Sequence, residues 1–296
     1  MVIQEAVMDM LCRLDLPLCD LGENPLWHGE SDEFVFTDIT NGALWAWNPD
    51  QEELRPRLLL NTPYLTGAFV FDQEGDIILF TEKGIFHVPY DGAPDRDMQL
   101  ICQLPLAEDE RFNDAICDPE GRIFAGTKTE RNEEGSLWKL ETCSQPVRIL
   151  TSLSISNGMG FSPDCRTFYH TDSGKRTITR WDYDRVKGEI SCPHPLVQLT
   201  DNTDTVPDGM TVDEEGAIWS AIWGGACIRR FDARFGQQIG SFPLPGSQTS
   251  SLIFGGKDLK RILVTSAACE GASTPSGAIW CLKSQIRGRE EYRAAY

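Results

Sequence analysis

The sequence predicts an all-β protein, a six-bladed β-propeller with four-stranded blades. Three observations predict this fold: one layout recurs six times, short apolar runs alternate with turn residues, and no long window shows helical periodicity. In each copy an apolar anchor is followed by a polar turn and a second apolar run. Successive anchors are separated by 44, 46, 44, 51 and 41 residues, a period typical of propellers and other repeat architectures. The anchors are Trp27, Phe71, Cys117, Phe161, Val212 and Ile253.

Each repeat contains about four strand-like runs, separated by turns rich in Gly, Pro, Asn and Asp. Four-stranded units arranged radially form a propeller, and six copies predict six blades. A β-sandwich array is the competing fold, but it has no reason to keep a constant period. In the third repeat the predicted strands are 115–117, 123–127, 137–140 and 147–150.

Closure of the ring requires one blade that both ends of the chain share. Residues 11–16 alternate between apolar and polar, which is typical of a half-buried strand. We expect this N-terminal strand to complete the last blade, which contains 261–265 and 278–282. Because the repeated units need one another, we expect residues 1–296 to form a single propeller domain.

The composition excludes several classes of protein. A formal net charge of -18 disfavours nucleic acids and anionic membranes, which bind surfaces rich in Lys and Arg. No apolar stretch is long enough for a membrane span of about 20 residues. The ten cysteines are scattered without a Cys-x-x-Cys pair, and Glu5 and Asp9 replace the basic segment of a signal peptide. We therefore expect a reduced, cytoplasmic protein.

The residues that lie four positions before each anchor suggest a metal-binding site. In a propeller the innermost strands line a central channel, so equivalent residues of the six repeats should meet at one height. Two carboxylates and two amides would meet there, and buried charges need a partner. These oxygen ligands suit Ca²⁺, Mg²⁺ or Mn²⁺. The six residues are Glu23, Gly67, Asn113, Asn157, Asp208 and Thr249.

Two alternatives stay open at this point. None of the four histidines occupies these positions, which makes Zn²⁺ a less favoured ion without excluding it. The polar residues can also serve only as caps that bond to turns at the starts of strands. Their common register in several repeats favours the metal.

Four motifs together resemble the regucalcin (senescence marker protein)/gluconolactonase family. They occupy residues 22–27, 111–114, 155–159 and 207–210, and the resemblance extends from about 22 to 280. The resemblance implies a six-bladed propeller that binds one divalent metal in its channel and hydrolyses a sugar lactone. Calcium is the expected metal, with Mg²⁺, Mn²⁺ and Zn²⁺ as alternatives.

The resemblance also implies the roles of individual residues. Glu23, Asn157 and Asp208 correspond to metal ligands, and Arg111 and Asn113 correspond to substrate-binding residues. A lactone is a cyclic ester that water must attack at its carbonyl carbon. A metal ion can polarise that carbonyl, and Asp208 is the candidate general base.

The residues that contact the substrate are predicted less sharply than the metal ligands. Glu130 lies in a segment, residues 128–135, that is shorter than in many relatives, so it is a candidate substrate contact or part of a solvated hairpin. Arg111 has planar donors suited to sugar oxygens, and its alternative role is a surface salt bridge with residues 108–110.

The sequence thus predicts a metal-dependent sugar lactonase of carbohydrate metabolism that converts an aldonolactone, such as gluconolactone, to the aldonic acid. One alternative is a calcium-binding regulatory propeller without catalysis. Another is a hydrolase of a different ester or lactone.

Overall fold

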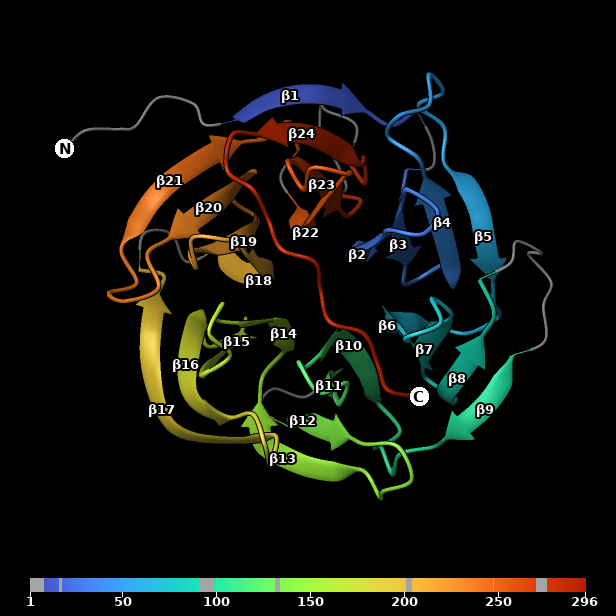
Figure 1. Cartoon of the computed structure of the whole chain (residues 1–296), viewed down its shortest axis with the longest axis vertical. Coiled ribbons are helices and arrows are strands. Elements are labelled where there is room, and N and C mark those ends of the chain that lie inside the picture. The colour runs from blue at the N-terminus through green and yellow to red at the C-terminus, as the bar shows by residue number, and fades with distance from the viewer. Residues whose placement is uncertain are drawn as a thin grey trace.

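The computed structural model confirms the predicted propeller: six four-stranded antiparallel sheets surround a central channel (Figure 1). Within each complete repeat the chain moves from the channel outward, so that the first strand is innermost and the fourth is outermost. The structure describes residues 8–15, 18–90, 98–130, 134–200, 204–246, 248–269 and 276–296.

The first three sheets follow one another along the chain. The first contains β2 (Gly22–His28), β3 (Glu33–Asp38), β4 (Ala43–Trp47) and β5 (Arg57–Asn61). The second contains β6 (Thr66–Phe71), β7 (Ile77–Thr81), β8 (Gly84–Val88) and β9 (Gln99–Cys102). The third contains β10 (Glu110–Cys117), β11 (Ile123–Thr129), β12 (Gly135–Leu140) and β13 (Val147–Leu153).

The next two sheets repeat this order, and the sixth departs from it. The fourth contains β14 (Ser156–Phe161), β15 (Thr167–Asp172), β16 (Thr177–Asp184) and β17 (Glu189–Gln198). The fifth contains β18 (Val206–Val212), β19 (Ile218–Trp223), β20 (Cys227–Phe231) and β21 (Gln238–Pro243). The sixth contains β22 (Thr249–Gly255), β23 (Arg261–Ser266), β24 (Trp280–Ser284) and β1 (Met8–Arg13).

The two ends of the propeller meet in the sixth sheet, as the sequence predicts. β1 forms its outermost strand and pairs with β24 in antiparallel orientation. The strand begins and ends about three residues earlier than the predicted 11–16. Beyond the strand, the Leu14 amide still donates a hydrogen bond to the Ile279 carbonyl.

The hydrophobic core lies between neighbouring sheets. In the described part of the chain, the buried apolar residues form six clusters, one between each pair of adjacent blades. The cluster between the first and sixth blades includes Leu14, Phe34, Phe36, Ile253 and Cys281. Because each sheet contributes both faces, every blade depends on its two neighbours for burial of its apolar surface.

Each inner strand carries an irregularity at the position that the repeat singles out. The pairing of the inner strand with the second strand shifts there in all six blades, and such bulges change the direction in which side chains point. Gly67 occupies the position in the second blade, where an added Cβ would lie 2.0 Å from the Phe112 carbonyl oxygen. The shifts fall between Glu23/Leu26, Thr66/Ala68, Phe112/Asp114, Asn157/Met159, Pro207/Met210 and Thr249/Ser251.

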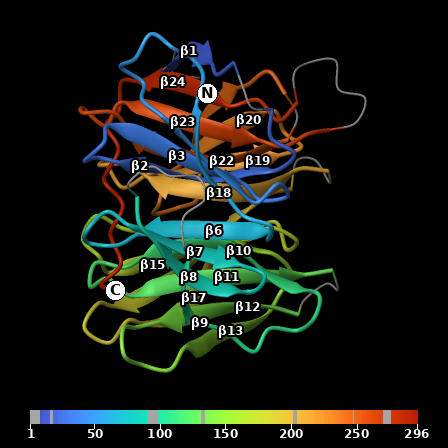
Figure 2. The ribbon, with the colours of Figure 1, turned by 90° about the vertical axis from the view of Figure 1, so that its right-hand side faces the viewer.

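The C-terminal strap, residues 285–296, crosses one mouth of the channel (Figures 1 and 2). Its buried Ala294 forms a parallel bridge with Asp72 and packs between the second and third blades. The strap meets the inner strands where they end, so it lies opposite the bulges. It contacts every blade, through Glu30, Phe71, Gly121, Phe161, Glu214 and Leu259.

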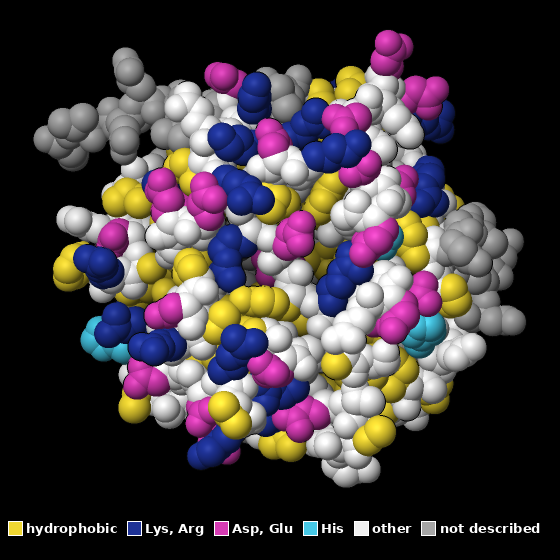
Figure 3. Space-filling model, in the orientation of Figure 1, with side chains coloured by type: hydrophobic (Ala, Val, Ile, Leu, Met, Phe, Trp, Pro, Cys, Tyr) yellow, Lys and Arg dark blue, Asp and Glu magenta, His cyan; other side chains and the backbone are white. Residues whose placement is uncertain are grey.

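Basic, acidic and hydrophobic side chains are interspersed on the face that carries the strap (Figure 3). All ten cysteines lie within the described residues, and each is a free thiol. The described residues include no helix with the length and hydropathy of a membrane span.

Deletion of the strap should destabilise the whole propeller. Removal of residues 287–296 loses five backbone hydrogen bonds to four different blades, each contributing about 1 kcal/mol, and it exposes the pocket of Ala294. We expect urea denaturation to show a loss on the order of 5 kcal/mol, whereas Glu290→Gln, at an exposed strap position, should have no effect. An unchanged midpoint in the truncated protein would contradict this role.

Candidate active site

We call the six residues that lie four positions before each anchor the ring positions. Three of them bring polar side chains together from separate blades. Glu23 lies on β2, Asn157 on β14 and Asp208 on β18, and their exposed fractions are 7%, 5% and 4%. The Asn157 amide donates a short hydrogen bond to Asp208 Oδ1. Glu23 lies close enough to Asp208 for the two charges to interact. The common register therefore becomes contact in space, although up to 185 residues separate the members of the set.

Neither carboxyl group of this set forms an ion pair with a described residue, although the charge of Arg111 acts on Glu23 and that of Lys128 on Asp208. Burial raises the pKa of Glu23 well above its usual range, and the neighbouring charges of Asp208 and Asp114 raise it further. Burial likewise raises the pKa of Asp208, with a second contribution from Asp114. A bound cation would favour the ionised forms of both groups.

Asn157 is held by a small hydrogen-bond network. Its Nδ2 also donates to Ser173 Oγ at 3.2 Å, and Ser173 donates in turn to the Pro207 carbonyl oxygen at 2.7 Å. Ser173 thus links β14 to the segment that carries Asp208. The adjacent Asp172 accepts backbone hydrogen bonds from Ser154 and turns away from this network.

Arg111 and Asn113 form the neighbouring part of the site on β10. Arg111 Nη1 donates to Asn113 Oδ1 at 3.1 Å and to the Phe112 carbonyl oxygen at 2.8 Å. The Asn113 amide donates to the Ser156 carbonyl oxygen at 3.1 Å, so it bridges to the fourth blade. The Arg111 guanidinium interacts with the charges of the buried Glu23 and the exposed Glu130, so it lies between the buried ring positions and the solvent.

Glu130 follows β11 and is exposed, and no hydrogen bond joins it to Glu23, Asn157 or Asp208. The sequence reading missed Lys128, two residues earlier. Lys128 lies directly opposite Arg111 in the β10–β11 ladder, and its charge interacts with Arg111, Glu130 and Asp208. The alternation of side chains in β11, traced back from Glu130, is the signal that could have found it.

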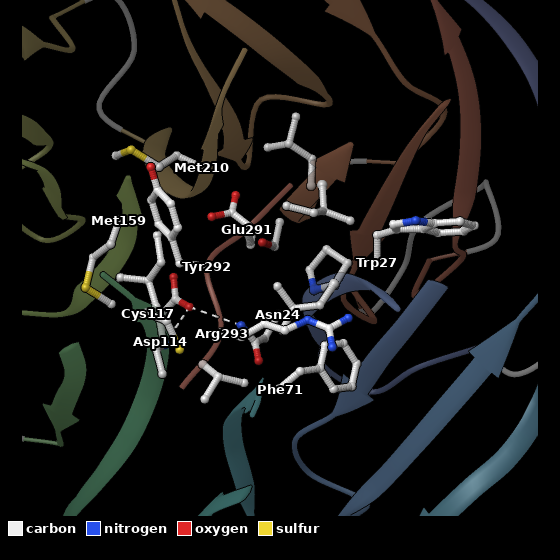
Figure 4. Close-up of a pocket in the computed structure, with 18 residues that line it drawn as sticks. Asn24, Trp27, Phe71, Asp114, Cys117, Met159, Met210, Glu291, Tyr292 and Arg293 are labelled. Atoms are coloured by element: carbon white, nitrogen blue, oxygen red, sulfur yellow. Dashed lines mark hydrogen bonds between the residues drawn. The ribbon is translucent and has the colours of Figure 1, made fainter. Parts of the chain in front are cut away.

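A second group of polar residues lies deeper in the channel, towards the strap (Figure 4). Asn24 adopts a positive φ of 43° within the bulge and donates to Asp114 Oδ1 at 3.3 Å. Its Oδ1 accepts a hydrogen bond from the Phe69 amide at 2.6 Å. Asp114 and Glu291 of the strap both line a cavity of about 50 Å³. Burial raises the pKa of Asp114 to about 7 and also raises the pKa of Glu291.

Asp72, Asp76 and His87 form another group of potential metal ligands in the described residues, with ligand atoms within 4.8 Å of one another. The group lies on the second blade, at the strap end of β6. His87 Nε2 is 3.2 Å from Asp72 Oδ2 and 3.4 Å from Asp76 Oδ2. Asp72 Oδ1 accepts two backbone hydrogen bonds from its own turn, and Asp76 Oδ1 accepts one from Tyr90.

Two equivalent turns show why this group is explained without a metal. Asp118 and Asp213 also follow the anchor of their repeat, are fully buried and accept hydrogen bonds from the backbone of the same turn. Their second oxygen contacts Arg122 or Arg230. His87 takes the place of these arginines in the second blade, so Asp72, Asp76 and His87 stabilise the turn.

Comparison with known protein families gives a match over most of the chain. The family model described as the SMP-30/gluconolactonase/LRE-like region matches residues 21–268. The chain belongs to this family. The match confirms the resemblance that the four motifs carry.

Individual relatives cover nearly the whole chain. A pentonolactonase of Haloferax volcanii is 34% identical over 286 residues, which are 93% of this chain and 95% of that protein. The crystal structure of a calcium-binding protein, regucalcin, from Agrobacterium tumefaciens superposes with a TM-score of 0.87 at 25% identity and covers 97% and 98% of the two chains. A luciferin-regenerating enzyme reaches a TM-score of 0.89 at 24% identity, covers 98% of this chain and 99% of its own, and supports the fold.

Asp114 should give this SMP-30 family member a pH-dependent stability. Its pKa rises from 3.8 to about 7 on folding, so the folded protein holds the proton more tightly than the unfolded chain. Stability should therefore fall as the pH rises from about 4 to about 7. Asp114→Asn can keep both hydrogen bonds that Asp114 Oδ1 accepts and should weaken this decline in chelator-treated protein.

Urea denaturation at several pH values measures the effect. Glu290→Gln, which replaces an exposed carboxylate, should keep the wild-type profile. Parallel profiles for wild type and Asp114→Asn would show that the Asp114 carboxyl does not drive the pH dependence.

Proposed function

We propose that this protein is a metal-dependent sugar lactonase that hydrolyses an aldonolactone to the aldonic acid. The observation that carries the proposal is the meeting of Glu23, Asn157 and Asp208 from three blades, with Arg111 and Asn113 beside them. The name of the Haloferax volcanii relative, a pentonolactonase, supports the reaction class.

The ring residues fit a hard divalent cation. Two buried carboxyl groups with raised pKa values need positive charge, and carboxylate and amide oxygens are the ligands that Ca²⁺ prefers. Asn157 now turns Nδ2 towards Asp208, and rotation of its amide by half a turn would present Oδ1 to the ion. We propose Ca²⁺, with Mg²⁺, Mn²⁺ and Zn²⁺ as alternatives.

The protein's own groups supply the proton transfers. A bound cation would act as a Lewis acid on the lactone carbonyl. Asp208 accepts a proton from the attacking water as its oxygen bonds to the carbonyl carbon. The bond between this carbon and the ring oxygen then breaks, and the ring oxygen takes up the proton that Asp208 accepted, so that it leaves as a hydroxyl group. The reaction adds one water molecule and opens the ring.

Arg111 and Asn113 hold the sugar in place beside this chemistry. Arg111 Nη1 donates to Asn113 and to the Phe112 carbonyl oxygen. The remaining N–H groups of the guanidinium can therefore donate to oxygens of the substrate. Asn113 is fixed by Ser156 on the fourth blade, so its orientation is set before the substrate binds. Glu130 is exposed at the entrance, and we propose that it contacts hydroxyl groups of the sugar.

A calcium-binding role without catalysis is the second candidate. The description of the Agrobacterium tumefaciens structure as a calcium-binding protein favours it. Both candidates need Glu23 and Asp208 as ligands, and only the lactonase needs Asp208 as a base. Hydrolysis is therefore the property that separates them.

Asp208→Asn should abolish most lactone hydrolysis. The amide cannot accept the proton of the attacking water, and loss of a general base typically lowers kcat by about 10²–10⁴-fold. The control is Asp204→Asn, which removes an exposed carboxylate from the segment just before β18 and should leave kcat unchanged. An Asp208→Asn enzyme with more than about a tenth of wild-type activity would contradict the assignment.

Removal of the metal should lower both activity and thermal stability. Calcium added to chelator-treated protein at about 100 times its Kd should raise the unfolding temperature on the order of 5 °C, because it relieves the repulsion between Glu23 and Asp208. Differential scanning calorimetry should show no such rise in the Glu23→Gln/Asp208→Asn double variant. An equal rise in that variant would place the stabilising ion elsewhere.

A further inference from the structure

Two cationic side chains lie side by side at the edge of the site. Arg111 and Lys128 are paired across the β10–β11 ladder, so their side chains extend from the same face of the sheet. Both are partly buried, and like charges directly opposite each other destabilise a sheet. In a chain with a net charge of -18, this arrangement calls for a specific reason.

The Lys128 ammonium is not held by the protein itself. Glu130 and Asp208 are near enough for their charges to act on it, yet no hydrogen bond or ion pair joins Nζ to a described residue. Arg111, in contrast, is fixed by Asn113 and the backbone. Lys128 therefore has three donors available beside a fixed guanidinium.

Metal binding would leave this region with excess positive charge. A divalent cation neutralises Glu23 and Asp208 together, which removes the carboxylates that otherwise balance the two cations. Glu130 can then offset only one of Arg111 and Lys128. Among the charges that act on these two cations, the positive charge would then exceed the negative charge by one.

The space next to these cations is large enough for a sugar acid. Arg111, Lys128 and Glu130 line a cavity of about 540 Å³, which lies within the range of small-molecule sites. The three ring ligands do not line it. A lactone whose carbonyl reaches the ring would therefore extend the rest of its chain past Lys128.

Acidic residues also line this cavity, but they have other partners or are exposed to solvent. Glu110 accepts hydrogen bonds from Thr127 Oγ1 and the Ala107 amide, and Glu82 is 3.6 Å from the Lys83 ammonium. Glu108 is exposed. The end of the cavity nearest the ring is thus its cationic end.

We propose that Lys128, together with Arg111, binds a carboxylate carried by the substrate, so that the preferred lactone derives from a sugar diacid. This inference rests on the proposed lactonase function and narrows its substrate class from neutral aldonolactones to lactones with a second, ionised carboxyl group. Lys128 acts here in specificity, and Asp208 remains the proton acceptor.

The experiment compares two lactones of equal ring size, those of gluconic acid and glucaric acid, which differ only in a terminal hydroxymethyl or carboxylate group. We expect kcat/KM to favour the glucaric acid lactone. Lys128→Met should lower the ratio of the two kcat/KM values by about 10–100-fold, because it removes one charge-assisted hydrogen bond, and Lys128→Arg should restore most of it. Lys83→Met, at the outer part of the cavity, is the matched control and should keep the wild-type ratio.

Binding provides a readout that does not need turnover. In the Asp208→Asn background, calorimetry should show weaker binding of the glucaric acid lactone after Lys128→Met, by the same factor. The loss should shrink at high ionic strength, which screens the charge on Lys128.

The possible outcomes distinguish a failure of the Lys128 proposal from a failure of the lactonase proposal. Hydrolysis of neither lactone would overturn the lactonase proposal. Asp208-dependent hydrolysis with a ratio that Lys128→Met does not change would overturn only the role of Lys128. A preference for the lactone of phosphogluconate over that of glucaric acid would also overturn the carboxylate assignment.

Discussion

The pairing of β1 with β24 is the contact on which the propeller depends. Each sheet buries apolar side chains on both faces, so an open ring would leave the first and sixth blades with bare surfaces. The cluster that includes Leu14, Phe34 and Ile253 covers them once the ring is closed. With all ten cysteines free, this closure is noncovalent, and the strand pairing and the apolar interface are joined by polar contacts such as the hydrogen bond from Ser250 Oγ to the Gly22 carbonyl oxygen. Closure also fixes the angles between the six inner strands and therefore the geometry of the site.

A closed ring can hold groups together that repel one another. Glu23 and Asp208 belong to blades with separate cores, and the interfaces between blades keep their carboxyls in the channel despite burial and mutual repulsion. Functional sites often store such unfavourable energy, and the rest of the fold supplies the stability that offsets it. In the proposed function a cation would relieve this repulsion, and the site would be organised before the ion or the substrate binds.

The sequence predicted the ring because the repeat is a strict geometric constraint. Glu23 and Asp208 stand at the same offset from their anchors, and a propeller converts equal offsets into equal height. The pairing of Lys128 with Arg111 escaped prediction because a bulge cannot be read from the pattern. A regular ladder that pairs Cys117 with Ile123 would place Thr129 opposite Arg111. The bulge at Asn113 moves the partner by one residue and brings Lys128 beside the guanidinium.

The C-terminal strap escaped prediction for a different reason, since it has no counterpart in the repeats. Its order comes from contacts with loops of all six blades, which are distant in sequence and meet only after the ring has closed. The strap and the β1–β24 pairing therefore support one another: closure creates the surface to which the strap binds, and the bound strap resists separation of any two blades. Because Glu23, Asn157 and Asp208 stand on different blades, resistance to separation keeps these side chains together, as the proposed metal site requires. The end of the chain that contributes no residue to the ring thus helps to maintain its geometry from the opposite mouth of the channel.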